Sequence, residues 1–134
     1  PTRRSSDLEI SLIVKEVDDV VLFADVEMFV SVMSNILTNA IKFTNRGGEI
    51  IVSSKVNNSQ IEISIKDNGV GIDKKHLANL FVIDKQNSEL GTEHERGSGL
   101  GLVLCKEFVE LHKGRIKVIS EKGKGTEFIV IFPK

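Results

Sequence analysis

The sequence contains one cysteine, Cys105, which lies among apolar residues of an expected helix. A single cysteine excludes disulfide bonds and cysteine-based zinc sites within the chain, and it fits a reducing compartment. A strong excess of either charge is also missing. The formal net charge of −1 gives no support for nucleic acid or an anionic membrane as a generic partner.

Long apolar runs are absent as well. No stretch approaches the roughly 18 residues of a membrane span, and no signal peptide is evident at the amino end. We therefore expect a cytoplasmic domain that makes no direct membrane contact, within a parent protein whose anchoring the sequence leaves open. With 134 residues, 40% of them apolar, the chain is long enough for one domain with a real core.

The chain begins with Pro1 rather than Met, which we interpret as a fragment or a processed piece. Residues 1–8 resemble one translated frame of a DNA-sequencing adapter. Our hypothesis is that they are not native, and we exclude them from the fold prediction. An ordinary polar, frayed terminus is the alternative. The domain is accordingly assigned to residues 9–134.

Hydrophobic periodicity predicts an α+β fold, a two-layer α/β sandwich in which helices cover one face of a mixed sheet. Asp25 is expected to cap a long helix whose apolar face comprises Phe29, Met33, Ile36, Leu37, Ala40 and Ile41. A short helix should follow Asp73 and extend through Phe81, and another should span residues 100–111. Strands are expected near residues 10–14 and 20–22, and as hairpins at 49–56 with 60–66 and at 115–120 with 126–132. Residues 82–96 are predicted to form a long mobile loop.

Three polar or glycine-rich segments occur in an order and at a spacing that together indicate a ligand site. They are Asn35–Thr44, Asp67–Ile72 and Gly97–Leu102. On a helix, Asn35, Asn39 and Lys42 form one polar stripe. Two amides and a lysine suit a divalent metal and the phosphates that it bridges, whereas a merely solvated stripe favours charged pairs.

The second and third segments complete a nucleotide pattern. The acceptor oxygens of Asp67 suit the exocyclic amine of a purine, and Gly69 and Gly71 allow the backbone to pass close to the ring. Gly97, Gly99 and Gly101 precede or open a helix whose free amides favour phosphate. A capped turn and close helix packing are the structural alternatives.

Together these motifs resemble the catalytic ATP-binding domain of two-component sensor histidine kinases, which has the Bergerat-type fold with a mobile ATP lid. The resemblance covers nearly all of residues 9–134. It implies ATP and Mg²⁺ as cofactors, Asn39 as the metal ligand with Asn35 nearby, Lys42 on phosphate, Phe43 against the base and Asp67 on the adenine amine. It assigns the pocket and lid hinge to Gly69, Gly71, Ile72, Gly97, Gly99, Leu100 and Gly101, and a water network to Thr126. Phe81 matches the family's phenylalanine box, but Asp84 replaces a second aromatic.

The resemblance further implies transfer of the γ-phosphoryl to a histidine on a separate dimerisation and phosphoacceptor domain of the same parent, with a response regulator acting downstream. None of His76, His94 and His112 lies in the helical His-Glu/Asp setting of a phosphoacceptor. Three rival interpretations stay open. They are a gyrase-like or mismatch-repair ATPase, an anti-sigma serine kinase, and a regulatory module that binds no nucleotide. Asn35 argues against the first two, which resemblance associates with a glutamate at that position.

Overall fold

The computed structural model describes residues 2–5, 10–14, 25–57, 59–81 and 100–133. Within these ranges six strands form one sheet in the order β1-β2-β3-β4-β6-β5. The strands are β1 (Thr2–Ser5), β2 (Ile10–Val14), β3 (Glu49–Val56), β4 (Gln60–Asp67), β5 (Arg115–Glu121) and β6 (Gly125–Pro133), and the helices are α1 (Val26–Phe43), α2 (Lys74–Ala78) and α3 (Leu100–Leu111). Strands β2 and β3 pair in parallel, and the other neighbours pair antiparallel.

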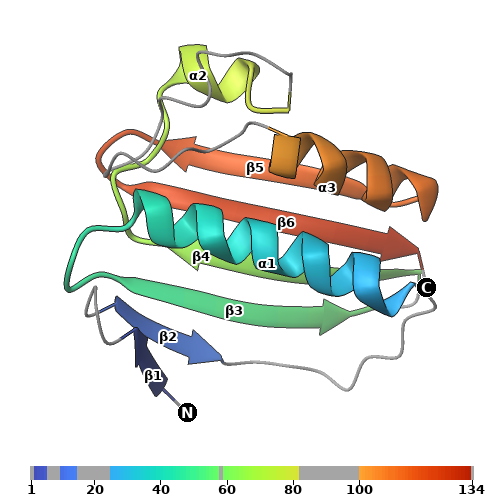
Figure 1. The fold of residues 1–134 in the computed structure, drawn as a ribbon, viewed down its shortest axis with the longest axis horizontal. Helices are drawn as coiled ribbons and strands as arrows, with labels where there is room; N and C mark the ends of the chain where they lie inside the picture. The colour runs from blue at the N-terminus through green and yellow to red at the C-terminus, as the bar shows by residue number, and fades with distance from the viewer. Residues whose placement is uncertain (1, 6–9, 15–24, 58, 82–99, 134) are drawn as a thin grey trace.

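Helices α1 and α3 lie side by side on one face of this sheet, which we call the inner face (Figure 1). The predicted α+β sandwich with a mixed sheet is therefore confirmed. None of the helices in the described ranges is long and apolar enough to cross a membrane.

Helix α1 begins where the sequence predicts. The Asp25 carboxylate accepts a hydrogen bond of 3.0 Å from the Met28 amide, as expected of an N-cap. At the other end the Thr44 hydroxyl donates to the Ala40 carbonyl at 2.6 Å. The fully buried apolar positions of the helix are Val32, Ile36, Ala40 and Phe43. Val32 was absent from the predicted apolar face, yet it belongs to the buried core cluster.

The two hairpins also follow the predicted pattern. In the β3–β4 turn the Asn57 side-chain oxygen accepts from the Ser59 amide at 3.0 Å and from the Gln60 amide at 2.7 Å. This closes the turn from within, as asparagine commonly does. The β5–β6 hairpin turns at residues 122–124.

Two expectations differ from the structure, and a third falls outside the residues that it describes. Thr2–Ser5 pairs antiparallel with β2, so excluding residues 1–8 removed a strand from the predicted sheet, although the origin of this segment stays a hypothesis. Helix α2 ends at Ala78, short of Phe81, because the chain leaves the helical conformation at Asn79. The strand expected at residues 20–22 lies outside the described residues.

The inner face of the sheet consists of cross-strand rows. The register aligns Val52 with Ile65, Phe128 and Val118, and then Ser54 with Ile63, Val130 and Ile116. These rows pack against α1 and α3 to form most of the core. The row at the end of the sheet is different, because it reads Ile50, Asp67, Thr126 and Ser120. Polar side chains are thus concentrated at one end of an otherwise largely apolar face.

Candidate functional site

Three chain segments meet beside this polar row. They are the end of α1, the turn after β4 and the β5–β6 hairpin. Val70 joins them, since its amide donates to the Phe43 carbonyl at 2.9 Å while its own carbonyl accepts from the Gly123 amide at 2.7 Å. Two of the three predicted motif segments, together with the hairpin that carries Thr126, therefore lie in one place.

The glycines of the turn are required by close backbone packing. A Cβ added at Gly69 would overlap the Phe43 carbonyl, and one added at Gly71 would overlap the Glu121 carbonyl. Gly71 also has a φ of +74°, which disfavours any side chain. The turn after β4 is thus held between the end of α1 and the β5–β6 hairpin, a reason for glycine that the sequence alone did not reveal.

Asp67 ends β4 with its side chain 2% exposed. Its Oδ1 accepts hydrogen bonds from the Gly69 amide at 2.8 Å and the Thr126 amide at 3.3 Å. Its Oδ2 is also buried, yet no described residue forms a hydrogen bond with it. A buried acceptor without a partner is costly in a folded protein, so this oxygen is well suited to receive a donor from a ligand.

Burial raises the pKa of the Asp67 carboxyl above its ordinary value of 3.8, and the two backbone hydrogen bonds from Gly69 and Thr126 partly oppose that rise. Burial is the larger effect because it removes water from the charged form. The ionised group is an acceptor at both oxygens, whereas a protonated group carries an O–H donor at one of them.

Thr126 is buried directly across from Asp67. Ser120, which is not among the predicted site residues, links it to the glycine turn. The Ser120 Oγ lies 2.7 Å from the Thr126 Oγ1 and accepts from the Ile72 amide at 2.8 Å. Only the strand register brings these residues together, so no local sequence signal could have identified Ser120.

The polar stripe of α1 is only partly open to solvent. Asn35 is half-buried against α3, where a Cβ added at Gly101 would lie 3.3 Å from its side-chain oxygen. Asn35 also forms a hydrogen bond with Cys105, whose pKa burial raises to about 11, so that thiol stays neutral. Lys42 is 7% exposed, with its Nζ 6.0 Å from the centre of the Phe43 ring. The structure therefore places Asn35 and Lys42 in packed surroundings that the stripe alone did not predict.

Asn39 is different, because its buried Nδ2 has no hydrogen-bond partner among the described residues. A half-turn of the side-chain amide would present oxygen instead of nitrogen at the same place. The described ranges contain no group of three or more His, Cys, Asp or Glu residues able to hold a metal. An amide oxygen together with nucleotide phosphates and water fits Mg²⁺, which usually keeps several waters.

Some predicted residues cannot be placed. Gly97, Gly99 and Asp84 lie outside the described residues, as does the predicted loop at 82–96. Leu100 is the first residue of α3. Phe81 packs against the core cluster.

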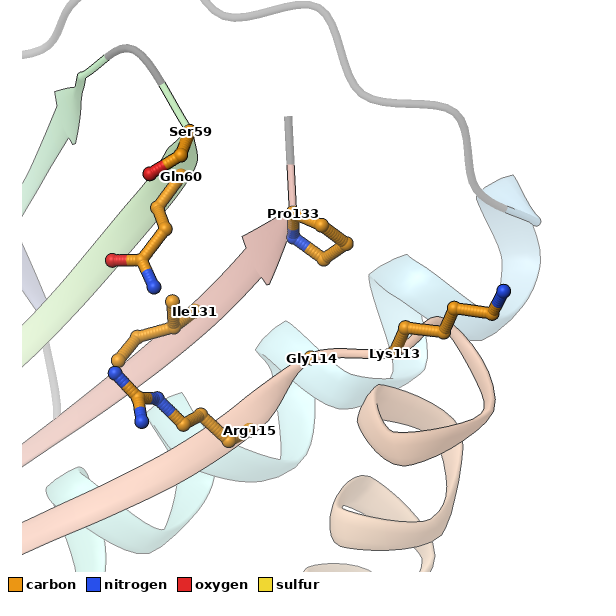
Figure 2. A pocket seen from close by; sticks show the side chains of 7 residues that line it. All are labelled: Ser59, Gln60, Lys113, Gly114, Arg115, Ile131 and Pro133. Atoms are coloured by element: carbon orange, nitrogen blue, oxygen red, sulfur yellow. The ribbon is translucent and has the colours of Figure 1, made fainter.

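A separate cavity of about 300 Å³ lies where β4 and β5 begin and β6 ends, at the opposite end of these strands from Asp67 (Figure 2). Its lining includes Gln60, Arg115 and Ile131. None of the predicted site residues lines it.

Comparison with known proteins gives consistent results. The family model described as "Histidine kinase-, DNA gyrase B-, and HSP90-like ATPase" matches residues 24–134. Sensor protein SrrB of Staphylococcus aureus (strain NCTC 8325 / PS 47) is 39% identical over 110 residues, which cover 82% of this chain and 19% of SrrB. The chain thus spans about a fifth of that relative's length.

Solved structures are similar in the same way. The mycobacterial sensor histidine kinase MprB is 26% identical with a TM-score of 0.77, covering 92% of this chain and 81% of the other. Full-length ShkA in complex with AMPPNP is 26% identical with a TM-score of 0.74, covering 92% of this chain and 25% of ShkA.

Proposed function

This chain belongs to the family of histidine kinase-, DNA gyrase B- and HSP90-like ATPases as a histidine kinase ATP-binding domain, and from that premise we propose that it binds Mg-ATP and donates the γ-phosphoryl to a histidine on another domain. Family membership accounts for ATP binding and for kinase chemistry in general. The metal, the acceptor and the individual site residues are our proposal.

The buried, unpartnered Oδ2 of Asp67 is the observation that carries this proposal. It lies at the end of the inner face, beside a turn with no side chains at Gly69 and Gly71. An exocyclic amine of adenine would satisfy the oxygen. That ShkA was crystallised with AMPPNP, an ATP analogue, supports an adenine nucleotide as the ligand class.

Asn39 would hold Mg²⁺ through its side-chain oxygen, and the metal, when bound, neutralises charge on the phosphates. Lys42 would add positive charge near the phosphates, and Phe43 would flank the base. As the resemblance implies, the glycines at 97, 99 and 101 with Leu100 would supply backbone amides to the phosphates. Ile72 and Thr126 would line the base end of the pocket.

Phosphoryl transfer needs no protein nucleophile, because it depends mainly on alignment of the reacting groups and on charge neutralisation. Asn35 is consistent with transfer to an imidazole rather than to water. An amide cannot remove a proton from water, and the loss of general-base help typically costs about 10²–10⁴ in rate. We therefore propose that Asn35 limits hydrolysis of bound ATP.

Since the chain spans only 19% of SrrB, its partners are also part of the proposal. The acceptor would be a dimerisation and phosphoacceptor domain of the same parent protein, in the cytoplasm. A response regulator would receive the phosphoryl group afterwards.

A transfer assay tests this function. The chain is mixed with γ-labelled ATP, Mg²⁺ and the parent's histidine-containing domain as a separate polypeptide. Acid-labile label on that domain is expected, with little label on the chain itself and slow release of phosphate. Asn39→Ala should abolish transfer, whereas Gln60→Ala, which truncates an amide at the distant cavity, should not. Rapid ATP hydrolysis by the chain alone, lost in Asn39→Ala, would favour the ATPase rival.

A further inference from the structure

The Ser120 hydroxyl contacts three groups from three parts of the site. It accepts from the Ile72 amide at 2.8 Å, lies 3.1 Å from the Gly125 carbonyl oxygen and lies 2.7 Å from the Thr126 hydroxyl oxygen. Ser120 is half-buried and ends the polar row opposite Thr126. It therefore connects the glycine turn to the strand that faces Asp67.

The donor and acceptor groups around Ser120 give these hydrogen bonds a consistent direction. The Ile72 amide is only a donor, and the Gly125 carbonyl is only an acceptor. The Ser120 hydroxyl donates to the Gly125 carbonyl at 3.1 Å, whereas either oxygen could be the donor in the contact with Thr126. With the Ser120 proton donated to Gly125, the short contact carries the Thr126 proton, and the second lone pair of Ser120 accepts it. In this arrangement Ser120 uses its full hydrogen-bonding capacity.

This direction determines what Thr126 presents to the pocket. Since its proton points to Ser120, its remaining lone pairs are acceptors. Thr126 faces Asp67 across β4 and β6, and the free Oδ2 of Asp67 is also an acceptor. Side chains directly opposite on paired strands are close enough to contact one small group together.

From this geometry we infer that Ser120 is a positioning residue for base selection, because it holds Thr126 as an acceptor and so makes this end of the pocket favour an amino group over a carbonyl group. The inference rests on the proposed nucleotide binding. Adenine offers two N–H donors on its exocyclic amine. A 6-oxopurine would instead direct a carbonyl oxygen at two acceptors, and buried polar groups left unpaired in this way give strong discrimination.

The inference predicts that loss of Ser120 changes the preference for adenine over a 6-oxopurine, rather than weakening the binding of both. Without Ser120, the Thr126 hydroxyl is free to rotate and donate to a ligand carbonyl. Ser120→Ala should therefore lower the ratio of the Kd for inosine diphosphate to the Kd for ADP by about tenfold, the factor for exchanging one repulsive contact for one hydrogen bond.

The experiment measures both affinities by calorimetry with Mg²⁺ present. Ser120→Thr keeps the hydroxyl and should keep the wild-type ratio. The matched control is Ser64→Ala. The Ser64 hydroxyl donates to Glu127 at 2.6 Å, and both side chains lie in the same sheet, on the face opposite to Ser120. It should leave the ratio unchanged. In a Thr126→Val background, Ser120→Ala should change the ratio no further, since its effect passes through Thr126.

Hydrogen exchange gives a readout without nucleotide. The Ile72 amide should exchange faster in Ser120→Ala and not in Ser64→Ala. Faster exchange with an unchanged Kd ratio would overturn the inference and leave Ser120 with a structural role alone. A wild-type protein that binds both diphosphates equally would also overturn it. If the folded wild type binds no adenine nucleotide, the proposed function itself fails, and base selection fails with it.

Discussion

Replacing Asp67 with asparagine is expected to weaken ADP binding by about 1–3 kcal/mol, or roughly five- to 150-fold in Kd. Asparagine keeps the oxygen that accepts from Gly69 and Thr126, so the turn should be retained. What changes is the buried position of Oδ2, where an acceptor becomes a donor. That donor would face the amine of adenine, and one hydrogen bond would become one repulsive contact.

The free energy of unfolding of Asp67→Asn should equal or exceed that of wild type. Burial raises the pKa of Asp67, so the folded state binds a proton more readily than the unfolded chain. Wild-type stability should therefore fall as pH rises through the folded pKa, while Asp67→Asn lacks this loss. At neutral pH the variant should be at least as stable as wild type, as measured by thermal unfolding without nucleotide. Weaker binding would then not reflect a failure to fold.

Calorimetric titration with ADP and Mg²⁺ at neutral pH provides the affinity. Glu127→Gln is the matched control, because it makes the same carboxylate-to-amide change on the open face of the sheet, opposite the helices, and keeps an acceptor for Ser64. It should bind like wild type. Equal affinities for wild type and Asp67→Asn would remove Asp67 from the site.

Three further predictions follow from the same contacts. Nucleotide affinity should fall as pH drops through the raised pKa of Asp67, above 3.8, because a protonated Oδ2 becomes a donor, and titrations at several pH values should show no such fall in Asp67→Asn. Asn39→Ala should weaken ADP binding more with Mg²⁺ than with EDTA, and an equal loss in both would argue against Asn39 as the metal ligand. Gly71→Ala should lower the free energy of unfolding by more than about 1 kcal/mol and by more than Gly123→Ala, since both glycines have positive φ but only the new Cβ at Gly71 would meet a carbonyl. Equal denaturation midpoints for these two variants would contradict the steric reasoning.

Local signals predicted the elements well, because caps and alternation depend on neighbouring residues. The Asp25 cap and the alternation of Ile61, Ile63 and Ile65 are examples, and both are confirmed. The connection between α3 and β5 shows where prediction from local signals fails. The residue with positive φ there is Lys113, at +62°, and not the glycine that follows it. Gly114 is instead required because a Cβ there would overlap the Ile131 carbonyl of β6.

In the candidate site, too, some residues could be recognised from the local sequence and others could not. Asp67 and the glycines after it stand out in the sequence, because their spacing is unusual. Ser120 does not, since its role depends on the pairing of β5 with β6. The burial of Lys42 was equally hidden, because it depends on how the end of α1 packs against the rest of the fold. Contacts between distant segments are what sequence patterns leave undetermined.

The row that contains Asp67, Thr126 and Ser120 is separate from the apolar rows that pack under the helices. Mutations at the proposed ligand contacts in this row should therefore leave most of the core untouched. A descendant of this domain has a short evolutionary path to a folded protein that no longer recognises its ligand.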